Sequence, residues 1–276
     1  MRALRLTIFI LIGLLTGCQH PQHPTGSASA TAQKTPLQDI IASGELRIAL
    51  SGDQPPFNMR GRDGELMGLD VDLANALASA MGLKTTLVPM PFAELLPALE
   101  EQRVDLVISA LTITPERNAR VPFAGPYYVS GTAALTKSDE LARVASMSVL
   151  DDDEHRFAAV SGTTNERFAK EHLPSAKLVS TPDFDAAVAL VLSDEVDAVL
   201  ADFPLCKYAS MKHADAGFSE QMRPFTIEPL GIAIRADAPL LVNLVQNYLD
   251  TLEYAGLLGQ MKAHWLGDDS WLEEMP

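Results

Sequence analysis

Residues 84–110 read KTTLVPMPFAELLPALEEQRVDLVISA, and residues 177–202 read KLVSTPDFDAAVALVLSDEVDAVLAD. Aligned without gaps, the two stretches match at a phenylalanine, at a Val-Asp pair and at a following valine: Phe92 with Phe184, Val104-Asp105 with Val196-Asp197, and Val107 with Val199. Each stretch runs from an apolar segment of strand length through a helix-length segment to a second apolar segment, which is the order of a βαβ unit. Apolar strands resemble one another by chance, but the repeated Val-Asp pair at one distance from a phenylalanine favours two duplicated lobes. Two such lobes facing each other create a cleft.

The chain from Leu46 onward continues this alternation. The strand-like runs LRIAL, TTLVPM and VDLVIS alternate with the helix-like segments LDVDLANALASAMG and FAELLPALEEQ. We therefore predict α/β lobes, each with a mostly parallel sheet flanked by helices. In the first helix Asp70 is the expected N-cap and Gly82 the expected stop. Pro97 should delay or kink the second helix, because proline lacks the amide hydrogen that a helix interior needs.

The N-terminus has the features of an export signal. Two arginines precede an apolar run over 6–15, which is shorter than the roughly 20 residues needed to span a bilayer. The run ends in Leu15-Thr16-Gly17-Cys18, which resembles a bacterial lipobox. We expect a signal peptide over 1–17 and diacylation of Cys18. Residues 18–36 are rich in Pro, Ser and Thr and should form a tether that keeps the protein on a membrane surface.

Composition narrows the class of protein further. Hydrophobic residues make up 47% of the 276 residues, and the part after the tether exceeds the usual size of one domain. The formal charge of −15 would repel a phosphate backbone, so we expect no nucleic-acid partner. With Cys18 acylated, Cys206 remains as a single cysteine and is expected to be a small buried hydrophobe.

Candidate ligand-binding residues follow the strands of the repeat. Ligands of open α/β sheets sit beyond the carboxyl ends of the strands, where Ser109-Ala110 follows one run and Asp202 follows the other. Thr114-Pro115-Glu116 is a helix-start signature that places Arg117 in the first turn, where a cation opposes the helix dipole. If Arg117 instead faces the cleft, its guanidinium can hold a carboxylate with two hydrogen bonds.

A glycine turn in the second lobe offers a further anion site. Gly162-Thr163-Thr164 follows the strand-like run FAAV and opens the helix-like segment NERFAKEHL, with Thr164 as the expected cap. Such a turn presents free backbone N–H groups to an anion, and this role is compatible with a purely structural one. Arg117 and these N–H groups suit a carboxylate, whereas Asp202 suits an ammonium group. Together they fit a zwitterionic α-amino acid better than a sugar or a metal ion.

A series of motifs between Glu45 and Leu266 resembles the bacterial family 3 solute-binding proteins, which feed polar amino acids to ABC importers. In chain order they are GDQPPF, GLDVDLANALA, PMPFAELLPAL, VDLVISALTITPER, PFAGPYY, SGTTNERFA, VDAVLADFP and EPLGIAIR. The resemblance implies a periplasmic binding protein (Venus-flytrap) fold, a hinged clamp between whose lobes the chain crosses twice. Lobe one would be 40–131 plus 231–270, and lobe two would be 132–230.

The resemblance also implies roles for particular residues. Arg117 would bind the ligand carboxylate with Ser109 and Thr112, and Asp202 would bind its ammonium group. Phe92 would stack on the ligand, and Thr163 and Thr164 would supply backbone donors from lobe two.

The sequence departs from the family pattern at residues expected to surround the side chain of the bound amino acid. Gln54 stands where many relatives carry an aromatic residue before Pro-Phe, and Ser51 replaces a frequent acid. The pocket has therefore lost an aromatic wall, which weakens the case for a cationic ligand such as arginine or lysine.

We expect the lobes to close around the amino acid, so that both of its charged ends are paired at once. The expected partner is an ABC transporter permease, and the protein is expected to be a monomer on the periplasmic or extracytoplasmic face of the cell envelope, without cofactor or metal. One alternative is an enzyme on the same scaffold that resembles cyclohexadienyl dehydratases, with Asp202, Glu94 or Glu166 as general acid. Another is a ligand-sensing partner of a membrane receptor, or an adhesive surface lipoprotein.

Overall fold

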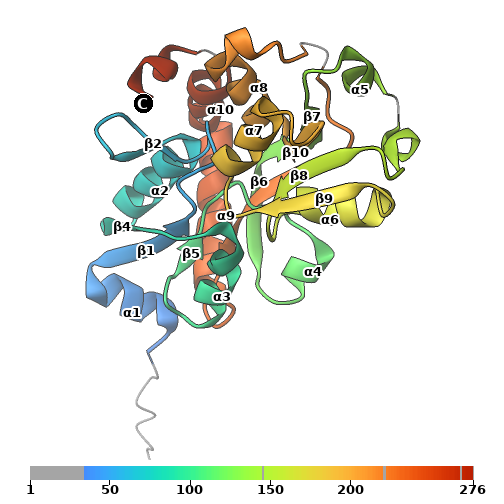
Figure 1. The fold of residues 1–276 in the computed structure, drawn as a ribbon. Coiled ribbons are helices and arrows are strands. Elements are labelled where there is room, and N and C mark those ends of the chain that lie inside the picture. The colour runs from blue at the N-terminus through green and yellow to red at the C-terminus, as the bar shows by residue number, and fades with distance from the viewer. Residues whose placement is uncertain (1–33, 145, 220–221, 268, 276) are drawn as a thin grey trace, which may run out of the picture. The chain divides into compact units, whose positions relative to one another are not determined.

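A computed structural model describes residues 34–275 except 145, 220–221 and 268, and most of its strands form two sheets (Figure 1). The predicted signal peptide, Cys18 and nearly all of the tether lie outside the described residues. Among the helices that are described, none is long and apolar enough to cross a membrane.

The first lobe is built on a five-stranded sheet with the order β4-β1-β5-β11-β6. Its strands are β1 (Glu45–Leu50), β4 (Lys84–Pro89), β5 (Leu106–Val107), β6 (Phe123–Ser130) and β11 (Glu228–Ile234). Strand β1 runs parallel to β4 and β5, whereas β11 runs antiparallel to both β5 and β6. The sheet is therefore mixed, with the predicted parallel pairing among β1, β4 and β5 and antiparallel pairing of β11 with its two neighbours. The reason is that β6 leaves toward the second lobe and β11 returns from it, so both strands join the sheet without a βαβ crossover.

The second lobe is built on a four-stranded sheet with the order β7-β10-β8-β9. Its strands are β7 (Thr132–Leu135), β8 (Arg156–Val160), β9 (Lys177–Thr181) and β10 (Ala198–Asp202). Strand β8 pairs in parallel with β9 and β10, and β7 is antiparallel to β10. A short hairpin of β2 (Met59–Arg60) and β3 (Leu66–Met67) lies outside both sheets. The protein thus has the two-lobed α/β fold that the alternating pattern and the resemblance predicted, and both of its main sheets are mixed.

Helices flank both sheets (Figure 1). Those that contact the first sheet are α1 (Pro36–Ser43), α2 (Leu69–Ala80), α3 (Leu95–Glu100) and α9 (Pro239–Tyr254). Those that contact the second are α5 (Asp139–Arg143), α6 (Thr164–His172), α7 (Phe184–Leu192) and α8 (Phe203–Lys212). The remaining helical segments are α4 (Pro115–Asn118), α10 (Leu257–Lys262), η1 (Phe92–Glu94), η2 (Met147–Leu150), η3 (Ala214–Ala216), η4 (Ala263–Gly267) and η5 (Ser270–Glu274).

The ends of the first two predicted helices follow local chemistry, with one correction. Gly68, not Asp70, is the N-cap of α2, and Asp70 lies fully buried in its first turn. The Asp70 carboxylate instead accepts hydrogen bonds from Asn58 Nδ2, Ala110 N and Tyr127 Oη. Gly82 follows α2 with a φ of 69°, which suits its predicted role as a stop. Pro97 lies in the first turn of α3, because η1 precedes that helix and delays its start.

The aspartate of the repeated Val-Asp pair makes the same contacts in both lobes. Asp105 accepts a hydrogen bond from the backbone N–H of Arg47 at 3.0 Å and pairs with its guanidinium at 2.7 Å. Asp197 accepts from the backbone N–H of Arg156 at 2.7 Å and pairs with its guanidinium at 2.9 Å. Each aspartate therefore holds the start of a neighbouring strand, which explains why the pair recurs at one position of the duplicated unit.

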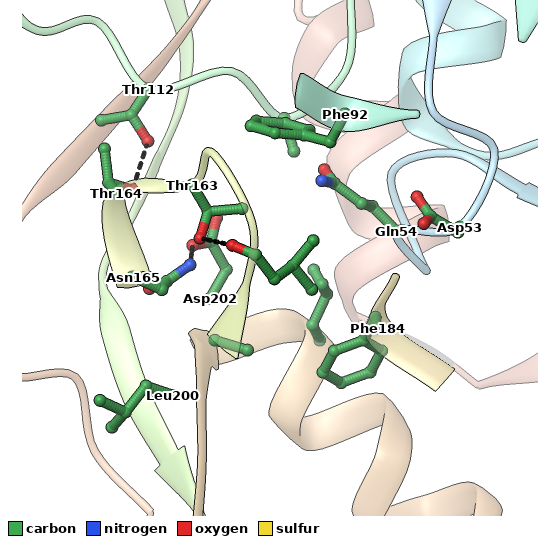
Figure 2. A pocket seen from close by; sticks show the side chains of 14 residues that line it. Asp53, Gln54, Phe92, Thr112, Thr163, Thr164, Asn165, Phe184, Leu200 and Asp202 are labelled. Carbon is green, nitrogen blue, oxygen red and sulfur yellow. Dashed lines mark hydrogen bonds between the residues drawn. The ribbon is translucent and has the colours of Figure 1, made fainter. Parts of the chain in front are cut away.

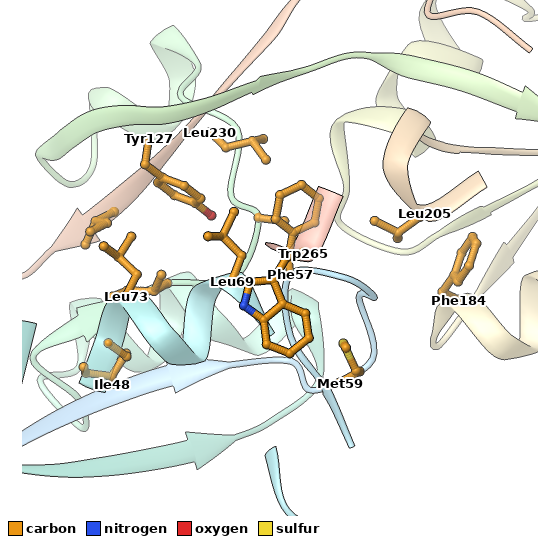
Figure 3. Packing of buried hydrophobic residues seen from close by; sticks show 14 of the residues in the cluster. Ile48, Phe57, Met59, Leu69, Leu73, Tyr127, Phe184, Leu205, Leu230 and Trp265 are labelled. Atoms are coloured by element: carbon orange, nitrogen blue, oxygen red, sulfur yellow. The ribbon is translucent and has the colours of Figure 1, made fainter. Parts of the chain in front are cut away.

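The largest hydrophobic cluster includes residues from both lobes. Figure 3 shows Ile48, Phe57, Leu69 and Tyr127 of the first lobe, with Phe184 and Leu205 of the second. Cys206 belongs to the same cluster and is fully buried, as predicted. Burial raises the pKa of its thiol, so Cys206 is no nucleophile at neutral pH.

Candidate functional site

A pocket lies between residues of the two lobes (Figure 2). Its lining residues are Asp53, Gln54, Phe92, Ala110, Thr112, Val160, Thr163, Thr164, Asn165, Phe184, Leu200, Ala201, Asp202 and Leu205. The free volume is about 20 Å³, which holds about one water molecule. The lobes are therefore closed in this structure, and side chains from both of them meet directly.

Arg117 lies beside this pocket, although it does not line it. Thr114 caps α4 by accepting a hydrogen bond from the Arg117 N–H, and Pro115 occupies the first turn as predicted. The Arg117 side chain is buried and donates from Nη1 to the Thr112 carbonyl at 2.9 Å and from Nη2 to the Gly162 carbonyl at 3.2 Å. Its guanidinium carbon lies 5.8 Å from the centroid of the Phe92 ring. Burial lowers the pKa of Arg117 to about 10, so the residue remains a cation at neutral pH.

Asp202 ends β10 and lines the pocket from the second lobe. Only 6% of its surface is exposed, and its Oδ1 accepts a hydrogen bond from Asn165 Nδ2 at 3.0 Å (Figure 2). Burial, together with the charge of Glu228, raises the pKa of Asp202 to about 7. The hydrogen bonds that the carboxyl accepts and the charge of Arg117 oppose this rise. Asp202 therefore changes its charge near neutral pH.

Ser109 and Ala110 occupy the end of the other strand of the repeat. Ser109 does not line the pocket, because its hydroxyl accepts a hydrogen bond from the Ser51 N–H at 3.0 Å. Ala110 lines it, with a φ of 45° that is unusual for a residue other than glycine. The bond from Ala110 N to the Asp70 carboxylate holds this conformation in place.

The threonines of both lobes meet across the pocket. The Thr112 and Thr164 hydroxyls lie 3.4 Å apart (Figure 2). The expected cap of α6 was wrong by one residue, since Thr163 accepts the capping bond from the Glu166 N–H. Thr164 is instead free to donate to Glu228 at 2.6 Å. The reason is that the helix begins at Thr164, one position before the run from which it was predicted.

Phe92 and Gln54 form part of the wall on the first lobe. Both side chains are buried, and the backbone of Gln54 is fixed by its N–H, which donates to the Asn58 carbonyl at 2.7 Å. Six of the eight predicted ligand-binding residues thus line one pocket, and Arg117 and Ser109 lie outside its lining. The two other carboxylates considered as general acids, Glu94 and Glu166, do not line it either.

Several residues at the site were not predicted. Phe184, the repeat partner of Phe92, lines the same pocket, and the alignment of the repeat could have indicated it. Glu228 accepts hydrogen bonds from four threonine hydroxyls: those of Thr112, Thr132, Thr164 and Thr226. These bonds outweigh burial and lower the pKa of Glu228, which is therefore a carboxylate next to the cleft. Asp53 and Asn165 also line the pocket; they lie within the motifs GDQPPF and SGTTNERFA, but no role was predicted for either residue.

Comparisons with known proteins agree with this architecture. The family model described as bacterial extracellular solute-binding proteins, family 3, matches residues 46–268. A cyclohexadienyl dehydratase from Pseudomonas aeruginosa is 30% identical over 240 residues, covering 87% of this chain and 89% of that protein. ABC transporter arginine-binding protein 1 of Escherichia coli is 27% identical, covering 81% of this chain and 91% of its own. A solved structure of a putative ABC transporter binding component from Wolinella succinogenes, complexed with lysine, is 35% identical with a TM-score of 0.77, covering 83% of this chain and 99% of that one.

Proposed function

This chain belongs to the bacterial extracellular solute-binding proteins of family 3, the amino-acid-binding proteins of ABC transport systems, and we propose that it captures its ligand by closing two lobes on a zwitterion. In this proposal Arg117 binds the α-carboxylate, Asp202 binds the α-ammonium group, and the closed form delivers the amino acid to an importer. The lobes would be 40–131 plus 231–270, and 132–230.

One observation carries the proposal: two buried side chains of opposite charge approach the pocket from different lobes. Arg117 comes from α4 of the first lobe and Asp202 from the end of β10 of the second, and less than a tenth of each is exposed. Burying a charge is costly unless it is paired. An α-amino acid between the lobes would pair both charges at once, and no single lobe could do so.

The contacts between the lobes indicate how the ligand would drive closure. Arg117 Nη2 donates to the Gly162 carbonyl, a neutral acceptor. A ligand carboxylate at this position would accept a charge-assisted bond, roughly twice as strong as a neutral one. Because the closed pocket holds only about 20 Å³, an amino acid must enter while the lobes are apart. Its binding energy then shifts the equilibrium toward a closed form with the ligand inside.

We further propose that acylation of Cys18 keeps this clamp at a membrane, where a transporter permease meets it. The lipobox-like Leu15-Thr16-Gly17-Cys18 and the tether over 18–36 support this part. A membrane sensor could instead recognise the same closed form. Deletion of a co-expressed permease distinguishes a transporter partner from a sensor partner, because loss of amino-acid uptake would favour transport.

The proposal is tested by a thermal-shift screen of the purified protein against the twenty common L-amino acids. A ligand that binds only the folded state raises the midpoint of unfolding, so at least one amino acid should do so. The N-acetyl and α-amide derivatives of that amino acid, each lacking one of the two charges, should fail to do so. A screen in which no amino acid raises the midpoint would refute the proposal.

A second candidate function is dehydration of a cyclohexadienyl acid, favoured by the Asp202 carboxyl. Its pKa of about 7 leaves it partly protonated at neutral pH, as a general acid requires. The 30% identical dehydratase supports considering this reaction. Incubation with prephenate or arogenate should give no aromatic product if the protein only binds its ligand, and turnover would favour the enzyme.

A further inference from the structure

The carboxylate of Asp53 is a second acidic group in the pocket, on the first lobe. Figure 2 shows it beside Gln54, across the pocket from Asn165 and Asp202. Its Oδ1 atom is buried and has no hydrogen-bond partner within the described part of the chain. A buried carboxylate oxygen without a donor is unfavourable, so this atom is suited to receive a donor from a ligand.

The charges around Asp53 have the same sign as Asp53 itself. Burial raises its pKa, and the nearby carboxylates of Asp183 and Asp185 raise it further, while the Ser51 hydroxyl opposes the rise. These two aspartates flank Phe184 at the start of α7. Among the ion pairs of the described residues, none involves Asp53, Asp183 or Asp185. This end of the pocket therefore attracts a cation.

Asn165 gives independent support for a ligand that donates hydrogen bonds. Only 6% of its surface is exposed, and it lines the pocket from the second lobe. Its Nδ2 donates to Asp202, whereas its buried Oδ1 has no partner among the residues described. The unsatisfied oxygens of Asn165 and Asp53 are both acceptors. Hydrogen-bond acceptors on both walls match a ligand rich in N–H groups.

The charge balance leads to the same class of ligand. Three carboxyl groups lie in or next to the pocket, those of Asp53, Asp202 and Glu228, whereas among the described residues that line it there is no lysine or arginine and Arg117 lies beside it. A neutral zwitterion would leave this excess of negative charge unchanged, whereas an amino acid with a cationic side chain would reduce it. The rings of Phe92 and Phe184 line the same space and can contact a side-chain cation or its aliphatic stem.

We propose that Asp53 selects amino acids with a basic side chain, pairing with their terminal ammonium or guanidinium group. This inference rests on the proposed binding of a zwitterion by Arg117 and Asp202. It also revises the expectation drawn from Ser51, because an acid two positions further along the chain supplies the negative charge that Ser51 lacks. Asp53 acts here as a specificity residue, and it is not needed for the α-amino and α-carboxyl groups.

The test is a calorimetric titration with L-arginine and with L-citrulline, which keeps the α-groups and chain length but replaces the guanidinium by a neutral urea group. The wild-type protein should bind arginine at least ~10-fold more tightly than citrulline, since a buried charge pair replaces a neutral contact. Asp53→Asn should bring this ratio close to one by weakening arginine binding, with citrulline affinity retained. Asp215→Asn removes the same charge at an exposed position in η3 that does not line the pocket; it is the matched control and should keep the preference.

The outcomes separate this inference from the proposed function. Equal affinities for arginine and citrulline, or an unchanged ratio in Asp53→Asn, would overturn the role of Asp53 and leave amino-acid binding intact. Absence of any heat with either ligand, and of a thermal shift with all twenty amino acids, would overturn both. Retained citrulline binding in Asp53→Asn also shows that this variant is folded.

Discussion

The Arg117 guanidinium of the first lobe donates from Nη2 to the main-chain carbonyl of Gly162 in the second lobe at 3.2 Å. The same side chain donates from Nη1 to the Thr112 carbonyl of its own lobe. Both acceptors are neutral, so these two bonds are not charge-assisted on the acceptor side, although the nearby carboxylates of Glu228 and Asp202 favour the cation. A ligand carboxylate that took the place of the Gly162 carbonyl as acceptor would form a charge-assisted hydrogen bond with Arg117. The stronger bond would favour the closed form with ligand over the closed form without it, which is the differential affinity that a two-state clamp requires.

Affinity for the amino acid should depend on pH through Asp202. Its pKa of about 7 lies above the ordinary aspartate value, and an ammonium group binds the carboxylate rather than the protonated acid. As pH falls from 8 to 5 the fraction of carboxylate falls, so the dissociation constant should rise, by about tenfold per pH unit well below the pKa. Calorimetry across this range measures the effect. A constant affinity in the wild-type protein would contradict the role of Asp202, and Asp202→Asn, though a weaker binder, should show no such dependence.

Glu228→Gln should destabilise the protein. The amide nitrogen cannot accept a hydrogen bond, so two of the four threonine hydroxyls lose their acceptor inside the structure. We expect a loss of about 1–3 kcal/mol in the free energy of unfolding, measured by urea denaturation. The pKa of Glu228 is lowered in the folded protein, so its stabilising effect is present above the unfolded pKa and is lost as pH falls through the folded pKa. The difference between wild type and variant should therefore shrink at low pH.

Glu116→Gln is the control for this variant. Glu116 also joins the lobes, through an ion pair with Arg167 at 2.9 Å, but both side chains are exposed. Exposed pairs contribute little, so its midpoint of unfolding should match that of the wild type. A Glu228→Gln protein that is as stable as this control would show that the threonine bonds do not hold the lobes.

Cys18→Ser should release the protein from the membrane fraction when it is expressed in its bacterial host. Acylation needs the thiol, and once the signal peptide over 1–17 is removed the unlipidated chain would begin with only a polar tether. Cell fractionation and labelling with a palmitate analogue measure both effects. Cys206→Ala removes a buried thiol instead and should stay in the membrane fraction with its label. A labelled, membrane-bound Cys18→Ser protein would refute the anchor.

The sequence could predict the duplicated lobes because local patterns encode them. The Val-Asp pair of each repeat holds a neighbouring strand through Arg47 or Arg156, and Asp202 lies at its strand end as expected. The direction of β11 could not be predicted, since it depends on where the chain returns from the second lobe.

Glu228 and Asp53 could not be predicted for a similar reason. The four threonines around Glu228 come from separate segments, and no spacing in the sequence links them. Asp53 becomes notable only once burial leaves one of its oxygens without a donor. The cap of α6 was misplaced by one residue because adjacent threonines offer the same hydroxyl, and only the backbone at Thr163 decides between them.

The central claim, that Arg117 and Asp202 hold the two ends of one amino acid, is tested most directly by calorimetric titration of the wild type, Arg117→Ala and Asp202→Ala with the amino acid found in the thermal screen. The wild type should bind, and each variant should lose detectable binding while its circular dichroism spectrum stays unchanged. An affinity in either variant equal to that of the wild type would contradict the shared binding of the zwitterion.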